Sequence, residues 1–562
     1  MKKIISLVLC MLMVFSSVAF SASAAENELK ITVANDLHLN LKDATAQKVA
    51  KRNNISEEYA HAATSGQLTY ESIEIIEAFL EKAAANDSSV VLMPGDLTNA
   101  GTRAEHEAFA ALIGSFEAET GKNVYVVPGN HDLFDTSVEE FEAMYAEFGY
   151  GEAIENDPMT ASYVAELDGE YRLLAIDSTT PGLSPHGVDA ELTAWIKAQC
   201  EKAKADGKKL IAIMHHNLLE HIVLVNVFHS SAVVNDDANQ LADILADGGV
   251  KYIFTAHTHD HDIAKHTSKA GNVIYDCVTN ALNAYPCAYR EVTFAKDVTI
   301  TTKNVDAIDT SSLPEGIHPD AMALLQTDFT AYAKNCNYTG LKAAFTAYTS
   351  IDNLKKLITT DDAALQAILD PVLVKVCEAV TLPLYTKNEK EAGKSIEAMA
   401  VKMGTTLPAT DYDSLIDVAL TVYMAHAEGD ENYPAYTNEV ILLQRAIAVV
   451  LNYALTDLTA ENYTLVLTFV LDLLNVEISD SLISTAGGAL EKFKGNELLL
   501  TTALIPVITK FTVDEAPADN NAVLLGYTDA EEGLSIGTFL EMIKSFFKGF
   551  IDFFRTLFAM FR

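Results

Sequence analysis

Five short groups of polar residues in the first half of the chain contain the side-chain types that bind metal ions. The groups are Asp36-Leu37-His38, Gly95-Asp96, Gly129-Asn130-His131-Asp132, His215-His216 and Ala256-His257-Thr258-His259. Each group follows a run of apolar and β-branched residues, as expected at the end of a buried strand. Carboxylate, amide and imidazole ligands without thiolates suit zinc, manganese or iron better than calcium. These residue types therefore predict metal-assisted chemistry.

Taken singly, the groups are weak signals. Asp36 and His38 lie two residues apart, so in an extended segment they point the same way and can share one metal ion. A lone Asp-x-His or Gly-Asp is nevertheless common in ordinary loops, and a single histidine at a strand end is more often a turn or core residue. Their order along the chain is a stronger signal, because the carboxyl ends of strands in an open α/β sheet meet at one crevice where ligands bind.

The elements that must position these groups alternate between strands and helices from about residue 29 to residue 302. Apolar, β-branched runs predict strands at residues 30–34, 90–93, 124–127, 173–176, 210–214 and 252–255. Helical periodicity lies between them at residues 73–85, 105–119, 138–148, 190–203 and 239–245. This alternation predicts an α/β domain with buried sheets, which the runs at 273–278 and 290–302 close as a meander.

After residue 306 the pattern becomes almost continuously helical. The helical runs are at residues 321–333, 338–349, 365–380, 414–427, 438–453 and 462–474. Since 562 residues are too many for one hydrophobic core, we expect an α/β domain at 26–305, an all-α domain at 306–510 and a linker at 511–533. The main residue of catalytic character in the helical domain is His426, so helix packing or partner binding is the default role of that domain.

Both ends of the chain carry apolar segments. Residues 1–25 have the layout of a secretory signal peptide: Lys2 and Lys3, an apolar run, then small residues before Glu26. This predicts an exported protein, secreted or extracellular, although a retained membrane anchor would begin in the same way. Residues 534–562 are rich in Phe and carry six charges in a polar stripe at helical spacing, which excludes a membrane-spanning helix.

Two interpretations stay open for residues 534–562. The segment is an amphipathic helix that docks on a membrane surface or a partner, which would make the protein cell-surface associated, or it is a terminal helix packed on the helical domain. The formal net charge of −39 argues against binding of nucleic acid polymers. Five cysteines remain outside the signal segment, without Cys-x-x-Cys spacing, so we expect neither a disulfide framework nor a thiolate zinc site.

In their order, the five groups resemble the pattern of the calcineurin-like metallophosphoesterase superfamily: Asp-x-His, Gly-Asp, Gly-Asn-His-Asp/Glu, His and Gly-His-x-His. The resemblance covers about residues 29–302 and implies a two-sheet α/β sandwich flanked by helices. It also implies two divalent metal ions, which would be manganese, zinc or iron. The implied ligands are Asp36, His38 and His259 on one ion and Asn130, His215 and His257 on the other, with Asp96 bridging them.

Three positions depart from the family pattern. Ala256 stands where Gly is usual, which leaves both following imidazoles in place. Asn217 stands where Pro is common, so whether His215 or His216 binds metal stays open; His215, nearer the strand end, is the expected ligand. Asn99 occupies the position of the tyrosine found in the subgroup with a tyrosine-ligated ferric ion, so we expect two divalent ions and no tyrosinate-iron colour.

The resemblance implies a hydrolase of phosphoric esters, in which a hydroxide bridging the two ions attacks phosphorus in line with the leaving oxygen. His131 is the expected catalytic residue, because it can protonate the leaving alkoxide or stabilise the transition state, with Asp132 as a candidate for orienting it. A hydrogen-bonding role alone is the alternative for His131. We expect a small phosphomonoester or phosphodiester substrate, which residues 39–70 and 218–237 would select if they cover the site. The competing hypothesis is a cell-surface interaction protein with a non-catalytic metal domain.

Overall fold

The computed structural model describes most of the chain between its two ends. The described residues are 28–41, 66–179, 187–222, 232–234, 238–313, 319–358, 360–387, 393–429, 431–434, 436–459, 461–463, 465–466, 469, 508, 512–514 and 516–527. The expected signal peptide at 1–25 and amphipathic helix at 534–562 lie outside these residues, so export and surface docking stay predictions. Residues 42–65 and 223–231 also lie outside, and their expected role in covering the site stays a prediction too.

The chain forms two compact units. The larger unit comprises residues 30–292 and 300–522. In the described part of the smaller unit, the rings of Phe294 and Tyr527 pack with their centroids 6.4 Å apart. Residues on both sides of position 305 belong to the larger unit. The domain boundary expected at residues 305–306 stays a prediction.

The first sheet has six strands in the order β13-β12-β11-β1-β2-β3. Its strands are β1 (Leu29–Val33), β2 (Val90–Pro94), β3 (Asn123–Val127), β11 (Ala288–Phe294), β12 (Val298–Asn304) and β13 (Asn521–Leu524). β1, β2 and β3 are parallel neighbours, so their carboxyl ends lie at one edge of the sheet. β13 belongs to the segment 511–533, for which the sequence predicts a linker; its four residues instead extend this sheet.

The second sheet has seven strands in the order β4-β5-β6-β7-β8-β10-β9. Its strands are β4 (Glu155–Asn156), β5 (Tyr163–Glu166), β6 (Tyr171–Ile176), β7 (Lys209–Met214), β8 (Val250–Thr255), β9 (Asp262–Thr267) and β10 (Val273–Val278). β6, β7, β8 and β10 are parallel and largely buried, which explains their apolar runs. Edge strand β9 escapes sequence-based recognition because Ile263 is the one buried residue among its six.

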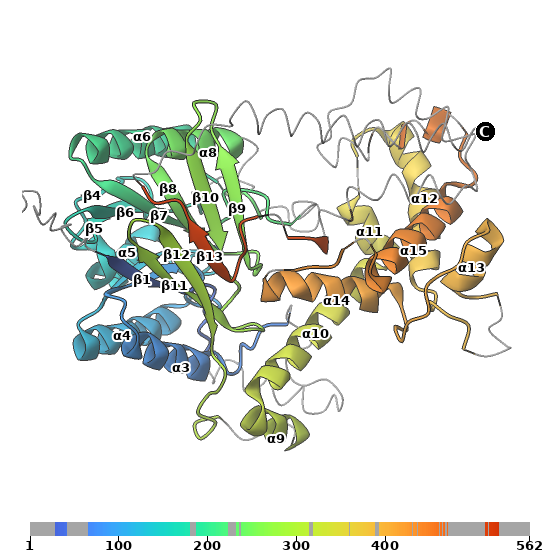
Figure 1. The fold of residues 1–562 in the computed structure, drawn as a ribbon, viewed down its shortest axis with the longest axis horizontal. Helices are drawn as coiled ribbons and strands as arrows, with labels where there is room; N and C mark the ends of the chain where they lie inside the picture. Colours follow the sequence, from blue (N-terminus) through green and yellow to red (C-terminus); the bar gives the residue numbers. More distant parts are fainter. Residues whose placement is uncertain are drawn as a thin grey trace, which may run out of the picture. The chain divides into compact units, whose positions relative to one another are not determined.

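Helices cover the two sheets on opposite sides. They are α3 (Ser72–Ala85), α4 (Arg103–Thr120), α5 (Val138–Met144), the π-helix η1 (Ala146–Tyr150), α6 (Ala190–Ala205) and α8 (Ala238–Asp247). In Figure 1, α3 and α4 lie on one side of the sheets, and α6 and α8 lie on the other. Leu192 and Ile196 of α6 and Leu241 and Leu245 of α8 pack with Ala212 of β7 in one core. The predicted two-sheet α/β sandwich is confirmed.

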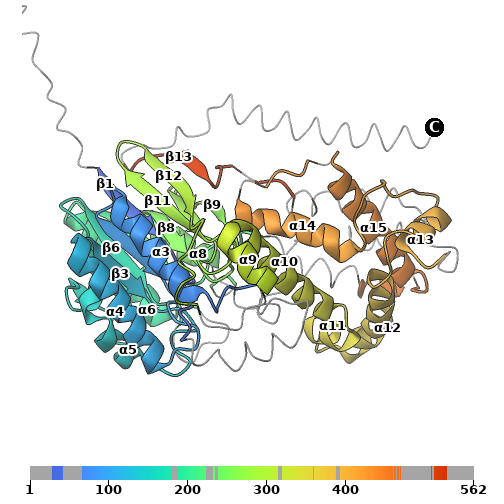
Figure 2. The ribbon, with the colours of Figure 1, turned by 90° about the horizontal axis from the view of Figure 1, so that it is seen from below.

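Residues 319–455 form the helical region that the sequence predicts (Figure 2). Its helices are α9 (Pro319–Thr327), α10 (Phe329–Tyr348), α11 (Ile351–Leu357), α12 (Ala363–Val380), α13 (Ile396–Met403), α14 (Leu415–Glu428) and α15 (Asn438–Leu455). The single helix expected at 321–333 is divided at Asp328, whose side chain accepts the backbone N–H of Ala331 and caps α10. α15 is long and apolar enough to cross a membrane by length and composition, but half of it is buried inside the protein.

Candidate metal centre

Strand ends from both sheets meet at one place in the larger unit. The groups after β1, β2 and β3 come from the first sheet, and those after β7 and β8 come from the second. Several hydrogen bonds join the sheets there. Among them, His215 Nδ1 contacts Pro94 O at 3.0 Å, and the backbone N–H of His257 donates to Asp36 Oδ2 at 3.0 Å. Because a carbonyl oxygen only accepts, His215 carries a proton on Nδ1 and presents Nε2 to the centre.

The first cluster consists of Asp36, His38 and His259, whose potential ligand atoms all lie within 4.8 Å of one another. Asp36 Oδ1 lies 3.5 Å from Nε2 of His259 and 3.8 Å from Nε2 of His38. The other carboxylate oxygen fixes the Asp36 side chain, because Oδ2 accepts the side-chain N–H of Asn35 at 2.6 Å as well as the backbone N–H of His257. These three side chains are the ones expected to share one ion.

The second cluster consists of Asn130, His215 and His257. Nε2 of His215 lies 3.1 Å from Oδ1 of Asn130 and 3.2 Å from Nδ1 of His257. The structure thus brings together the three side chains that the sequence predicts for the other ion. The neighbouring His216 also lies near this cluster, but its Nδ1 contacts the Ser178 hydroxyl at 2.7 Å.

Asp96 lies between the two clusters. Its Oδ2 is 3.6 Å from Nε2 of His38 and 3.4 Å from Nε2 of His215. Its Oδ1 points elsewhere and accepts the backbone N–H of His131 at 2.8 Å. One carboxylate oxygen therefore faces both clusters, which is the arrangement that a bridging ligand requires.

Five of the seven expected ligands have a left-handed backbone. The φ angles are 49° for Asp36, 43° for His38, 50° for Asp96, 71° for His257 and 58° for His259. A non-glycine residue in this region costs on the order of 1–2 kcal/mol, so each needs support from its surroundings. Among the described residues, Cys287 is the other non-glycine residue with positive φ. Strain is thus concentrated at the metal centre, as is common where side chains are held for function.

The electrostatics of the centre suit cations. Burial lowers the pKa of His38 to about 3, so its imidazole is neutral at ordinary pH and can act as a ligand. Burial acts in the same direction on His215, but the Asp96 and Asp36 carboxylates outweigh it and raise the pKa of His215 to about 9. The same carboxylates that stabilise an extra proton on His215 would stabilise a metal ion bound there in place of that proton.

The side chains fit a metal ion by a second criterion. Neither ring nitrogen of the buried His38 has a hydrogen-bond partner among the described residues, and the same is true of Asp36 Oδ1. A buried polar atom without a partner costs free energy, which a bound cation would offset. The donors therefore fit the two divalent ions expected from the sequence.

His131 lies beside the first cluster, with its ring centroid 4.7 Å from that of His38. Its Nδ1 contacts Asn99 O at 2.7 Å, so Nδ1 carries the proton and Nε2 is left to act on a substrate. The ring of Phe134, which is 62% exposed, packs against His131 with a centroid distance of 4.7 Å.

Asp132 does not orient the His131 ring, contrary to the expectation. Its buried carboxylate accepts the backbone N–H groups of Leu97, Thr98 and Gly129 and the Thr98 hydroxyl. Asp132 therefore ties the loop that carries Asp96 to the loop that carries Asn130. The orienting atom for His131 is a backbone carbonyl, which no residue type reveals in a sequence.

His221 lies in the segment 218–237, which the sequence predicts could cover the site, but its side chain is bonded to two carboxylates of the fold. It is buried, with Nδ1 2.5 Å from Asp262 Oδ2 and Nε2 3.1 Å from Asp276 Oδ2. His229 lies outside the described residues. None of the five described cysteines forms a disulfide.

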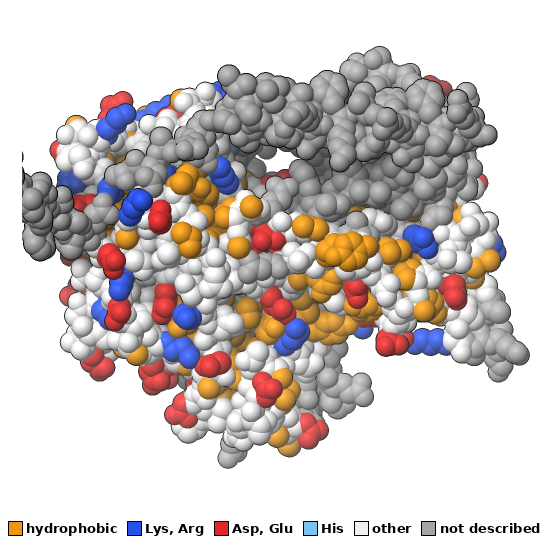
Figure 3. Space-filling view, in the orientation of Figure 1, with side chains coloured by type: hydrophobic (Ala, Val, Ile, Leu, Met, Phe, Trp, Pro, Cys, Tyr) orange, Lys and Arg blue, Asp and Glu red, His pale blue; other side chains and the backbone are white. Residues whose placement is uncertain are grey.

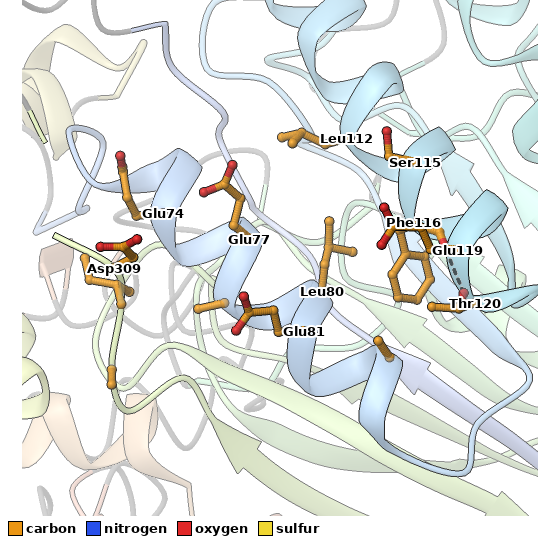
Figure 4. A pocket seen from close by; sticks show the side chains of 14 residues that line it. Glu74, Glu77, Leu80, Glu81, Leu112, Ser115, Phe116, Glu119, Thr120 and Asp309 are labelled. Carbon is orange, nitrogen blue, oxygen red and sulfur yellow. Dashed lines mark hydrogen bonds between the residues drawn. The ribbon is translucent and has the colours of Figure 1, made fainter. Parts of the chain in front are cut away.

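A separate cavity of about 580 Å³ lies between α3, α4 and residues 307–309. Figure 4 shows carboxylates of Glu74, Glu77, Glu81 and Asp309 around it. None of the expected ligands lines this cavity, and its acidic wall is unsuited to an anionic substrate. It is not part of the metal centre.

The model of one protein family matches residues 29–261, and its description is calcineurin-like phosphoesterase. This span contains all seven expected ligands and His131. Residues 29–261 form a calcineurin-like phosphoesterase domain. The phosphoesterase domain accounts for the paired sheets and for the order of the five polar groups.

Two curated relatives are similar to parts of the chain. A probable glycerophosphodiester phosphodiesterase of Arcobacter nitrofigilis is 29% identical over 161 residues, which are 28% of this chain and 54% of the relative. A probable cyclic nucleotide phosphodiesterase of Rhodococcus erythropolis is 24% identical over 266 residues, which are 46% of this chain and 82% of the relative. The chain thus spans about half of the first relative's length.

Similar solved structures include a dimetal phosphatase from Danio rerio, with 10% identity and a TM-score of 0.37. The match covers 49% of this chain and 96% of that one. A purple acid phosphatase from yellow lupin seeds has 11% identity and a TM-score of 0.35, over 52% of this chain and 53% of that one.

Proposed function

We propose that the phosphoesterase domain hydrolyses phosphoric esters and that it does so with two divalent metal ions. The observation that carries this proposal is the position of Asp96 Oδ2, which faces Nε2 of His38 and Nε2 of His215 at 3.6 and 3.4 Å. Asp36, His38 and His259 would hold one ion, and Asn130, His215 and His257 the other. Oxygen and nitrogen ligands of this kind suit manganese, zinc or iron.

Two ions held this way would supply charge neutralisation for the phosphoryl group and would activate a water molecule as the nucleophile at neutral pH. The protein's own contribution is to place the remaining groups. His131 has its Nδ1 proton committed to Asn99 O, so a second proton, carried on Nε2, is the one it can give to the leaving oxygen. Asp132 maintains the spacing of the Asp96 and Asn130 loops through its four hydrogen bonds.

We propose a small phosphoester as the substrate, with phosphodiesters favoured over phosphomonoesters because both curated relatives carry phosphodiesterase names. Long nucleic acids are disfavoured by the net charge of −39. On the face shown in Figure 3, acidic and basic side chains of the described residues are interspersed and form no continuous basic patch. The exposed ring of Phe134 beside His131 would contact the leaving group of a bound ester.

The test is hydrolysis of p-nitrophenyl phosphate and bis-p-nitrophenyl phosphate with and without added Mn²⁺ or Zn²⁺. We expect metal-dependent hydrolysis, faster with the diester, and its loss in Asp96→Asn. Activity that is unchanged by chelation of metal would overturn the proposal. Two bound metal ions without hydrolysis of either ester would point to a narrower substrate, whereas no bound metal would favour the interaction-protein hypothesis.

A further inference from the structure

The carboxyl-terminal end of α14, in the helical region, contacts the loop that carries His257 and His259. The backbone N–H of His261 donates to the carbonyl oxygen of His426 at 2.9 Å. Gly429 packs so closely on the His261 ring that a Cβ at position 429 would lie 2.8 Å from its Cδ2 atom. Both partners belong to the larger compact unit, so a helix far away in the sequence directly supports the metal-binding loop.

A second set of contacts holds this end of α14 in place. Glu428 Oε1 accepts the hydroxyl of Tyr285 at 2.8 Å and Nζ of Lys334 at 2.7 Å. The Glu428 carbonyl oxygen accepts the side-chain N–H of Asn520 at 2.9 Å. Tyr285 lies five residues after Asn280, whose side chain donates to His259 O at 2.5 Å. The segment that contains Asn280 and Tyr285 therefore touches both the metal-binding loop and the end of α14.

The loop needs such support because of its backbone. His257 and His259 both have left-handed φ angles, which persist only where surrounding contacts hold them. His261, two residues beyond His259, is fixed on three sides: by His426 O, by the Thr302 hydroxyl at 2.7 Å from Nε2, and by the backbone N–H of Asn280 at 3.2 Å from Nδ1. Of these three contacts, the one with His426 comes from the helical region.

We infer that residues 426–429 are positioning residues for the metal centre. The helical region then contributes to metal binding by holding the loop that carries His257 and His259. Residues 426–429 act through His261 and touch neither metal nor substrate. This inference rests on the proposed function, because it presupposes that His257 and His259 bind metal. It assigns the helical region a role other than partner binding.

The test compares two tyrosines in matched settings. The Tyr285 hydroxyl donates to Glu428 at 2.8 Å, and Nζ of Lys334 lies 5.0 Å from the Tyr285 ring. In the same way, the Tyr338 hydroxyl donates to Asp417 at 2.8 Å, and Nζ of Lys342 lies 5.6 Å from the Tyr338 ring. Phe at either position removes one hydrogen bond of the same kind, but only Tyr285 holds the end of α14 that contacts His261. We expect Tyr285→Phe in the full chain to raise the Kd for Mn²⁺, measured by calorimetry, about three- to tenfold, and Tyr338→Phe to leave it unchanged.

A second variant perturbs the contact with His261 more strongly, in case the loss of one hydrogen bond changes the Kd for Mn²⁺ too little to measure. Gly429→Ala places a methyl group against His261, whereas Gly404→Ala, at the end of α13, also has positive φ but has nothing within 4 Å of its Cβ. We expect weaker Mn²⁺ binding in Gly429→Ala alone, with both variants folded by circular dichroism. If the wild type binds Mn²⁺, the inference is overturned by an unchanged Mn²⁺ affinity in Tyr285→Phe and Gly429→Ala. It is also overturned if the control variants lose as much Mn²⁺ affinity as these two. Absence of Mn²⁺ binding by the wild type would instead refute the proposed function.

Discussion

Oδ2 of Asp96 lies 3.4 Å from Nε2 of His215 and also 3.6 Å from Nε2 of His38, so one carboxylate oxygen serves both clusters. Asp96→Asn replaces that charge by a neutral amide. We expect loss of at least one bound metal ion and a drop in phosphoester hydrolysis of about a thousandfold or more, since a bound metal supplies several kcal/mol of charge stabilisation. Metal analysis and steady-state kinetics measure both effects. Asp206→Asn, at a solvent-exposed ion pair with Arg172, is the control and should change neither.

His131 is expected to act on the substrate and not on the metal. Its Nδ1 is bonded to Asn99 O, and although His131 lies near His38 and Asp96, each cluster has three other side chains besides Asp96. His131→Ala should therefore lower kcat about 10²- to 10⁴-fold and leave two metal ions bound. Metal content by atomic absorption distinguishes the outcomes, because a variant that loses metal would show that His131 is a ligand.

The two adjacent histidines after β7 should differ in their effect on metal binding. His215 Nε2 faces Asn130 and His257, whereas His216 Nδ1 is bonded to the Ser178 hydroxyl. We expect His215→Ala to abolish binding of one ion and His216→Ala to weaken it by about tenfold, as is usual for residues that support a ligand. Titration of each variant with Mn²⁺ measures this. The reverse order of effects would assign the ligand to His216.

The exposed ring of Phe134 should contribute to the binding of aromatic esters. It packs against His131 and is 62% exposed. Phe134→Ala should raise KM for bis-p-nitrophenyl phosphate about two- to tenfold, because an aromatic pair contributes roughly 0.5–1.5 kcal/mol. Met159→Ala removes an apolar side chain of similar exposure and serves as the control. A change confined to kcat would speak against contact with the leaving group.

The buried His221 should make stability fall at alkaline pH. Burial lowers its pKa, but the Asp276 and Asp262 carboxylates outweigh burial and raise the pKa to about 10, above the usual 6.5. Because the folded state then binds the proton more tightly than the unfolded state, the contribution is complete below about pH 6.5 and is lost as the pH rises toward 10.

Urea unfolding of the metal-free protein at pH 6.5 and at pH 9.5 measures most of this loss, which over these pH values is at most about 4 kcal/mol at roughly 1.4 kcal/mol per pH unit. The His221→Gln variant should lack most of the dependence, and His266→Gln, at the partly exposed pair with Asp243, should retain it. Parallel pH dependence in the wild type and in His221→Gln would show that other groups are responsible.

Several features of the fold and the centre follow from the sequence alone. β2 and β3 precede Asp96 and Asn130 as continuous apolar runs, because strands buried on both faces must be apolar throughout. Polar residues directly after such runs lie at the carboxyl edge of the sheet, where parallel strands end together. This reasoning places the five polar groups at one edge, whereas the division into two clusters with Asp96 between them was implied by the resemblance to the calcineurin-like metallophosphoesterases.

Other features depend on contacts that leave no local signal. The choice of His215 over His216 depends on which ring faces Asn130, and the orientation of His131 depends on the carbonyl of Asn99, an atom that every residue type possesses. The contact of His261 with His426 joins segments from the two halves of the chain. Sequence periodicity describes the buried face of each element, but it does not determine which backbone groups meet when the elements pack. Only the tertiary structure therefore shows the contact between the helical region and the loop that carries His257 and His259.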